Sequence, residues 1–370
     1  MAHGPLEEYH YPCDQCGADL RFAPGQTRLV CDHCGHEQAI PAAVGRGTAL
    51  GLHELDLRAG LRNALMDDAV EDLRSISCPN CGAVIELSEE AHAGECPFCA
   101  TPVVIDTGAR RQIKPQGLVP FSITEEEARD SLGRWLRSLW FAPNGLKVYA
   151  RKGRRMNGIY SPFWTFDADT RSRYRGQRGT YYYETRTVTV TVNGKRQHRQ
   201  EQVRKIRWTP VSGRVARHFD DVLVLAATSL PRSFTDALKP WDLSALVPYQ
   251  PDYLAGFRAE GYTVDLDDGH RIGREEMARV IEMDVRRDIG GDAQRVEAVD
   301  TDFSAETFKH ILLPVWTAAY KYGGKSYRFV VNGQTGKVRG ERPWSWIKIA
   351  FAVLLAAIVA GIIFGLSQNQ

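Results

Sequence analysis

Eight cysteines are the residues of this chain best suited to bind metal ions, and all eight precede residue 100. They form four C-x-x-C pairs, and fourteen residues separate the two pairs in each half of the set. Four thiolates complete a tetrahedral zinc site, and the glycines of CDHCG and CPNCG fit the tight turn around a metal. We therefore predict two structural Zn²⁺ ions in tandem zinc ribbons, bound by Cys13, Cys16, Cys31 and Cys34 and by Cys78, Cys81, Cys96 and Cys99.

Both predicted sites are closed, because four cysteines leave no coordination position for water or substrate. His33 and His36 lie beside the first site, and we expect them to be solvated or to contact its ligands from outside. The loops between the pairs, GADLRFAPGQTRLV and GAVIELSEEAHAGE, lack the basic and aromatic surface typical of nucleic-acid binding. A protein partner is therefore the favoured interpretation of the ribbons.

The C-terminal part of the chain has the composition of a membrane span. Residues 349–366 are uncharged, and a helix of that length covers roughly 27 Å of a bilayer core of roughly 30 Å. Trp344 and Trp346 match an interfacial aromatic belt, and Lys348 can extend toward water. Basic residues precede the run and none follows it, so we expect residues 347–366 to lie in lipid as a single-pass tail anchor with the N-terminal bulk in the cytosol.

Two features of the anchor remain open. Gly361 and Gly365 form a G-x-x-x-G, the spacing with which membrane helices pair, so a homodimer is one alternative. A lone match of this kind is also common in helices rich in alanine and glycine. The reducing cytosol that this topology implies argues against disulfides between the eight cysteines.

The rest of the chain has the pattern of an α+β body. A T-x-x-E capping signature at Thr124 predicts a helix with an apolar face, and Asn193-Gly194 predicts a long β-hairpin. Two P-x-W-T segments, at residues 162–165 and 314–317, indicate a duplicated strand–helix–strands module. The apolar face of the predicted helix consists of Leu132, Trp135, Leu136, Leu139 and Trp140.

These patterns divide the chain into seven segments. Apolar residues at helical spacing over residues 52–75 predict an amphipathic spacer helix, and the second module should open with the strand YTVDL and a helix over residues 272–289. We expect ribbon 1 at residues 1–45, the spacer at 46–76, ribbon 2 at 77–107, module 1 at 108–217, a Pro-rich helical connector at 218–260, module 2 at 261–343 and the anchor at 344–370.

Charge is distributed unevenly although the net charge is only +2. Residues 147–217 hold eighteen Lys and Arg against four Asp and Glu, and residues 218–310 hold ten against nineteen. The two segments either attract each other or face different partners.

The hairpin around Asn193-Gly194 is polar on both sides, so we predict that it projects from the body as a basic arm. An anionic lipid surface is one candidate contact, where each cation contributes about 1 kcal/mol. Nucleic acid is the other, with Tyr181–Tyr183 and Trp208 available to stack on bases. The basic side chains on or near the arm are Arg186, Lys195, Arg196, Arg199, Arg204 and Lys205.

No catalytic motif is recognisable in the sequence. The GGKS at residues 323–326 lacks the first glycine of a phosphate-binding loop and lies between two predicted strands. There is no G-x-S-x-G, and every cysteine is assigned to a metal. We therefore predict no catalytic residues and no enzymatic activity.

The paired CPxCG ribbons, DVRRDIGGDAQRV, the segment from FKHILLPVWTAAYKYGGKSYRF to GERPWSWIKI and the final apolar helix resemble one family. It comprises bacterial membrane-anchored double zinc-ribbon proteins often labelled primosomal protein N′ (replication factor Y), superfamily II helicase, or TFIIB-type zinc finger protein. Such proteins occur beside flotillin-like (SPFH/virion-core) and phage-shock protein A homologues.

The resemblance implies the bacterial inner membrane and a non-enzymatic adaptor that brings such proteins there, in a membrane-stress system. The helicase label conflicts with the lack of a nucleotide-binding loop, so the label reflects the ribbons alone. The alternative is a nucleic-acid-binding zinc-ribbon protein without motor activity.

Overall fold

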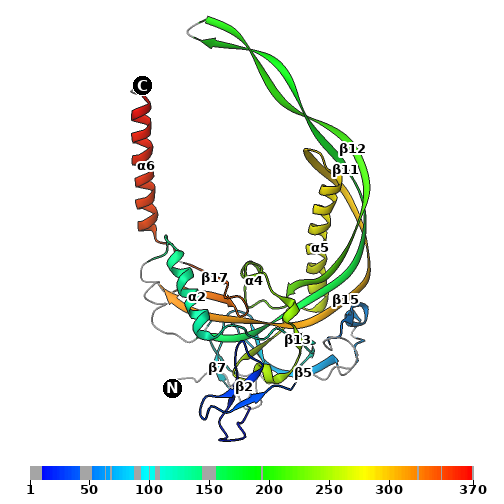
Figure 1. Cartoon of the computed structure of the whole chain (residues 1–370), viewed down its shortest axis with the longest axis vertical. Coiled ribbons are helices and arrows are strands. Elements are labelled where there is room, and N and C mark those ends of the chain that lie inside the picture. The colour runs from blue at the N-terminus through cyan, green and yellow to red at the C-terminus, as the bar shows by residue number, and fades with distance from the viewer. Residues whose placement is uncertain are drawn as a thin grey trace.

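The computed structural model describes residues 11–41, 52–62, 64–66, 69–86, 93–99, 101–104, 109–143, 156–192, 195–322, 325–342 and 344–368. The fold is α+β, with a body from which two long elements rise on the same side (Figure 1). One is the arm formed by β11 (Asn157–Val192) and β12 (Lys195–Leu225), and the other is the helix α6 (Trp346–Gln368).

A curled sheet built on β11 and β15 (Ala293–Tyr322) forms the frame of the molecule. The two strands pair antiparallel from Asn157 opposite Thr317 to Gly179 opposite Ala293. The other edge of β11 pairs with β12 from Phe163 to the tip of the arm, so beyond Gly179 the arm is a two-stranded ribbon. The free edge of β15 is extended by β16 (Lys325–Asn332) and then β17 (Val338–Gly340).

The two P-x-W-T segments flank one point at the centre of this sheet, on opposite sides of the pair formed by Ser161 and Leu313. Residues 158–164 of β11 pair antiparallel with residues 310–316 of β15, and Ser161 is opposite Leu313. The indole of Trp164 donates to the Val264 carbonyl at 2.9 Å, and that of Trp316 donates to the Ile123 carbonyl at 3.1 Å. Each acceptor lies directly before the N-cap of a helix, so the two halves of the body are related by an approximate local two-fold.

The short strands follow the same relation. β10 (Gly117–Leu118), which precedes the first helix, runs parallel to β15. β14 (Arg258–Gly261), which precedes the second, runs parallel to β11. Each half therefore contributes its first strand to the long strand of the other half.

The helix of the first half, α2 (Glu125–Ser138), begins as its sequence predicts. The Thr124 side chain accepts from the Glu127 backbone N–H at 3.3 Å, and the Glu127 carboxylate accepts from the Thr124 N–H at 2.8 Å. This reciprocal pair satisfies backbone donors that the first turn leaves free. Trp140 lies beyond the end of α2 and is 78% exposed, so its assignment to the apolar face of this helix was wrong.

The helix of the second half, α5 (Leu266–Ile289), lies along the inner side of the curved arm (Figure 1). Its buried residues recur every fourth position from Gly269 to Ile289, which gives one continuous packing stripe. A Cβ at Gly269 would lie 2.5 Å from Trp164, and one at Gly273 would lie 2.8 Å from Phe166. The glycines thus let the helix approach the sheet closely.

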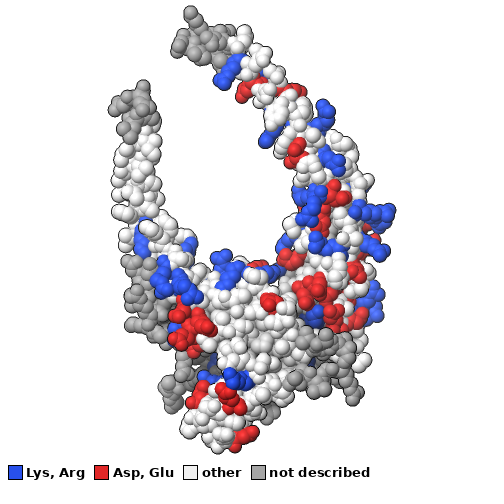
Figure 2. All heavy atoms as spheres, in the orientation of Figure 1, with Lys and Arg blue, Asp and Glu red and all other residues white. Residues whose placement is uncertain are grey.

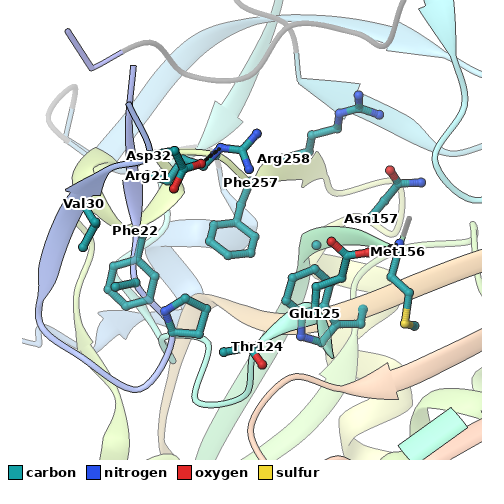
Figure 3. Close-up of a pocket in the computed structure, with 15 residues that line it drawn as sticks. Arg21, Phe22, Val30, Asp32, Thr124, Glu125, Met156, Asn157, Phe257 and Arg258 are labelled. Carbon is teal, nitrogen blue, oxygen red and sulfur yellow. Dashed lines mark hydrogen bonds and ion pairs between the residues drawn. The ribbon is translucent and has the colours of Figure 1, made fainter. Parts of the chain in front are cut away.

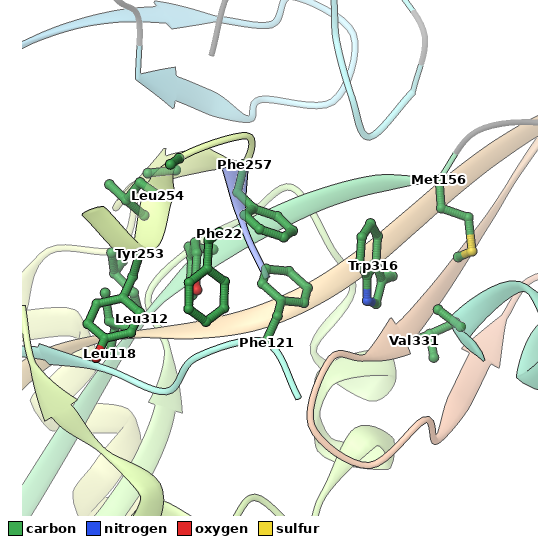
Figure 4. Packing of buried hydrophobic residues seen from close by; sticks show 14 of the residues in the cluster. Phe22, Leu118, Phe121, Met156, Tyr253, Leu254, Phe257, Leu312, Trp316 and Val331 are labelled. Atoms are coloured by element: carbon green, nitrogen blue, oxygen red, sulfur yellow. The ribbon is translucent and has the colours of Figure 1, made fainter. Parts of the chain in front are cut away.

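An aromatic core joins the N-terminal segment to the sheet (Figure 4). Phe22 belongs to the first cysteine-rich unit, residues 11–41, and packs edge-on to Tyr253 at 5.2 Å between ring centroids. Phe121 stacks on Phe257 at 4.3 Å and contacts Trp316. The first cysteine-rich unit and the body therefore share one hydrophobic core.

The remaining elements are short. The other helices of the described residues are α1 (Leu57–Leu61) and α4 (Arg232–Leu238), with 3₁₀ turns at Leu243–Ala245 and Pro251–Leu254. The other strands are β1 (Leu20–Phe22), β2 (Arg28–Cys31), β3 (Glu37–Ala39), β4 (Leu55–Asp56), β5 (Val70–Ser77), β6 (Val84–Glu86), β7 (Ala93–Glu95), β8 (Pro102–Val104), β9 (Ala109–Ile113) and β13 (Val247–Pro248).

Several segment predictions need correction. The spacer helix expected over residues 52–75 is reduced to Leu57–Leu61, and Val70–Ser77 is a strand that pairs with β6 and β9. The strand expected at YTVDL lies earlier, at Arg258–Gly261, and the following helix starts at Leu266. The segment LKVYAR at residues 146–151 also has the sequence of a strand, but it lies outside the described residues.

Candidate metal centres and the apolar C-terminal helix

The four cysteines of each N-terminal set converge on one point. The Sγ atoms of Cys13 and Cys34 are 3.7 Å apart, and those of Cys16 and Cys31 are 3.5 Å apart. All four ligand atoms lie within 4.8 Å of one another. A Zn–S bond of about 2.3 Å in a tetrahedron gives sulfur–sulfur edges of about 3.8 Å, so the spacing fits a bound ion and excludes disulfides.

The second set repeats this geometry. Cys78 lies 3.6 Å from Cys99 and Cys81 lies 3.6 Å from Cys96, measured between Sγ atoms. The cysteines pair in the same order as in the first set, first with fourth and second with third. The sequence prediction of two four-cysteine groups is therefore confirmed, and each group can hold a metal ion.

A repeated backbone turn points the sulfurs inward. In three of the four C-x-x-C pairs, the glycine after the second cysteine donates its N–H to the carbonyl of the first, at 2.8 to 2.9 Å. These three glycines, Gly17, Gly35 and Gly82, have φ between +73° and +74°. Glycine adopts this conformation without strain, which explains why the motif carries it.

The thiol chemistry of both groups suits a metal. The backbone N–H of Cys34 donates to the sulfur of Cys31 and lowers the pKa of that thiol to about 6, and a hydrogen bond with Cys96 lowers the pKa of Cys81 to about 5. Thiolate is the form that binds a metal. Each group thus holds a thiol that is ready to ionise at neutral pH.

The two groups differ in their surroundings. Cys16 and Cys34 are exposed, so the first group opens to solvent on one side. In the second group Cys78, Cys96 and Cys99 are buried and pack with Phe98, Ile159, Val315 and Val330 of the body. The second group is therefore part of the hydrophobic core, whereas the first lies at its edge.

The helix α6 stands clear of the body (Figure 1). Its span Trp346–Phe364 has a mean hydropathy of 2.7, and none of it is buried. Among the described residues, it is the one helix long and apolar enough to cross a membrane, by length and composition. Its first turn is attached to the body, because Lys348 Nζ donates to the carbonyls of Trp140 at 3.2 Å and Ala142 at 2.8 Å.

The arm separates into two parts. Close to the body, charges of the basic and acidic segments pair across it: Arg217 makes a bidentate contact with Asp284, and Arg173 lies 3.2 Å from Asp300. The two segments therefore attract each other there, as one of the two sequence-based alternatives predicted. Beyond Gly179, neither β15 nor α5 covers the ribbon.

Most of the residues predicted to contact lipid or nucleic acid lie on this distal ribbon, which is the two-stranded part of the arm beyond Gly179. Arg204 covers the ring of Tyr181 at 4.4 Å, Arg207 covers Tyr182 at 5.2 Å, and Tyr183 is 63% exposed. Lys205 pairs with Glu184. Cation–π contacts of this kind stiffen the ribbon and keep its cations on the surface.

A cleft that no sequence pattern predicted lies between the first cysteine-rich unit and the body (Figure 3). It has a volume of about 540 Å³, with Phe22, Phe257 and Trp316 among its apolar lining. Arg21 and Arg258 line the same cleft, and Glu125 lies at its α2 end. Residues from five distant segments meet here, so no local sequence pattern reveals it.

Comparison with known proteins yields one informative relative. The chain is 25% identical over 346 residues to "Uncharacterized protein YdjG" of Bacillus subtilis strain 168, which covers 92% of each chain. No protein-family model matches the sequence, and no solved structure matches the chain. The similarity extends through nearly the whole length of both chains.

Proposed function

We propose that this protein is a non-enzymatic, tail-anchored adaptor. In this proposal α6 spans the bacterial inner membrane, and the body presents a protein-binding surface at its cytoplasmic face. The observation that carries the proposal is the exposure of α6: this apolar helix of 23 residues is about 34 Å long, and none of its span Trp346–Phe364 is buried against the described residues. A bilayer removes that surface from water.

The two four-cysteine groups act as structural zinc ribbons in this scheme. Closed Cys₄ sites fold a chain segment too short to build its own core. The approximate two-fold relation between the two halves of the sheet supports a duplicated body, and the zinc ribbons pack on that body. Their role is to shape the binding surface rather than to perform chemistry.

The cleft between the first ribbon and the body is the proposed partner site. Its aromatic floor fits an apolar side chain of a partner, and its wall carries charges of both signs, with Arg21 3.6 Å from Asp32. The proposed partner is accordingly a protein segment with an apolar anchor residue, and a flotillin-like or phage-shock protein A-like protein is the candidate that the sequence resemblance supplies.

The anchor is tested by membrane extraction of the full chain. We expect the native protein to remain in the membrane pellet at alkaline pH. The pair Leu354→Arg and Ile358→Arg should move it to the soluble fraction, because each charge at the centre of a span costs about 2.5–3.5 kcal/mol. Gln368→Arg, beyond the apolar run, is the matched control and should stay in the pellet; release of the native chain itself would refute the anchor.

Nucleic-acid binding is the second candidate, and the distal ribbon favours it. Residues 180–207 hold seven Lys and Arg against two Asp and Glu. Arginines already cover Tyr181 and Tyr182, which leaves Tyr183 as the exposed ring for base stacking. Tight binding of single-stranded DNA that weakens steeply with salt, and that Tyr183→Ala reduces, would favour this function over the adaptor.

A further inference from the structure

The C-terminal end of α2 lies against the foot of α6, although the two are far apart in the sequence. The Ser345 N–H donates to the Phe141 carbonyl at 2.8 Å, and the rings of Phe141 and Trp344 are 6.5 Å apart. Lys348 reaches the carbonyls of Trp140 and Ala142 from the first turn of α6. These contacts place residues 140–142 at the level at which α6 begins.

Exposed tryptophans from both segments gather at this level. Trp140 and Trp346 are each 78% exposed, and Trp344 is 52% exposed. Arg342 lies over the Trp344 ring at 4.4 Å. Tryptophan has an apolar ring with a polar N–H and is enriched at the boundary between hydrocarbon and water, so this set has the chemistry of a headgroup-level belt.

The charge of α2 changes along its length, from acidic at its start to basic at the end that lies next to α6. Its first turn holds Glu125, Glu126 and Glu127, whereas its last two turns hold the exposed Arg134 and Arg137 and no acid. Figure 2 shows the same polarity, with basic side chains around the foot of α6 and acidic ones farther from it. The end of α2 next to α6 is therefore the cationic one.

We propose that the C-terminal end of α2 is a second membrane contact, in which Trp140 enters the headgroup region beside α6 and Arg134 and Arg137 face anionic lipid. This inference rests on the proposed anchoring by α6. The bilayer is the occupant because the tryptophans continue the apolar surface of α6, and because the cations complement the negative cytoplasmic leaflet. Two contacts, rather than one, then fix the orientation of the body above the membrane.

Quenching of tryptophan fluorescence by brominated lipid tests the contact. The full chain is reconstituted into vesicles of phosphatidylcholine and phosphatidylglycerol, with or without bromine near the headgroup end of the acyl chains. We expect Trp140→Phe to remove about as much quenchable fluorescence as Trp346→Phe does. Trp135→Phe is the control on the same helix, because its ring packs on Phe329 in the body, and it should leave the quenched amplitude unchanged.

The outcomes separate this inference from the anchor itself. Loss of quenching with Trp346→Phe but not with Trp140→Phe would overturn the α2 contact and leave the anchor intact. Absence of any quenching in the native chain would show that α6 is outside the bilayer, so the proposed function would fail. The pair Arg134→Gln and Arg137→Gln should at least halve the excess quenching in anionic over neutral vesicles, and an unchanged excess would overturn the role of these arginines.

Discussion

Lys309 binds together three carboxylates that come from distant parts of the chain. Its Nζ lies 3.1 Å from Glu54, 3.3 Å from Asp167 and 2.9 Å from Asp221. Lys309 and Asp167 are 5% and 6% exposed. Burial raises the pKa of Asp167, whereas for Lys309 burial is outweighed by the hydrogen bond to Asp221 and the neighbouring negative charges, which raise its pKa. The ion-paired arrangement therefore depends on the lysine remaining charged.

Removal of this cation should destabilise the body strongly. We expect Lys309→Met to lower the free energy of unfolding by about 3–5 kcal/mol at pH 7, because Asp167 is left buried without a counter-charge. The deficit should shrink as the pH falls through the raised pKa of Asp167, since protonation of Asp167 removes the buried charge. Chemical denaturation with excess zinc measures both effects.

The exposed ion pair on the arm provides a control for the loss of stability expected in Lys309→Met. Lys205 and Glu184 are both more than a third exposed, and an exposed pair contributes at most about 1 kcal/mol. Lys205→Met should therefore have little effect on stability. Equal losses for the two variants would contradict the structural role assigned to Lys309.

At the scale of elements, the two cysteine groups should release metal at different rates. The first group has Cys16 and Cys34 at the surface, whereas opening the second group disturbs the packing of Phe98, Val315 and Val330. We expect a chelator to remove the first ion roughly tenfold faster, which requires a difference of about 1.4 kcal/mol in opening free energy. Metal release is followed with a chromogenic zinc indicator.

Single-site variants assign the two phases of metal release. Cys16→Ser should remove the fast phase and Cys81→Ser the slow one, and each should reduce the metal content to one ion per chain. A single phase in the native protein, or loss of the slow phase in Cys16→Ser, would contradict the difference in burial.

Elements with local signals were predictable from the sequence, and those set by long-range packing were not. The Thr124 cap specifies its own backbone, so α2 starts where expected, and the alternating residues around Asn193-Gly194 form the predicted pair of strands. Asn193 and Gly194 themselves lie outside the described residues. Residues 70–77 have apolar spacing compatible with a helix, but β6 and β9 flank them and make them a strand. Trp140 reads as part of an apolar stripe because sequence spacing does not reveal that the helix ends at Ser138.

The same distinction holds for the candidate sites. The spacing of the cysteines was sufficient to predict both metal groups. Each C-x-x-C turn is local, and each group needs only two turns that are neighbours in the sequence to meet. The cleft required Arg21, Phe257 and Trp316 to meet, and the α2 contact required Lys348 to reach Trp140. Contacts of this kind follow from the path of the sheet, which no single motif encodes.

At the scale of the whole molecule, the arm and α6 leave the body on the same side (Figure 1). A flat bilayer perpendicular to α6 would therefore meet the arm. The distal ribbon has charges on both faces. Lys205 and Glu184 form an ion pair on one face, and Arg204 lies opposite Tyr183 on the other face. Charged side chains are excluded from hydrocarbon unless paired, so the ribbon cannot cross it.

This conflict is removed if the two-stranded ribbon beyond Gly179, which β15 does not support, bends along the membrane surface. The contacts between α6 and residues 140–142 then stay in place at the level of the headgroups. Residues 180–207 have seven basic and two acidic side chains, so contact with anionic lipid stabilises this arrangement by about 1 kcal/mol for each cation that reaches the surface.

Tryptic cleavage of the arm distinguishes the arrangements. With the full chain in vesicles that contain phosphatidylglycerol, we expect cleavage after Arg199 and Arg204 to slow several-fold relative to neutral vesicles, because lipid covers the ribbon. The protection should disappear at high salt, where the Debye length falls to about 3 Å. Exposed Arg279 on α5 serves as the internal reference. Equal protection in neutral vesicles would place the ribbon within the bilayer, and no protection in either would show that the arm points away from the membrane and is free for a protein or nucleic-acid partner.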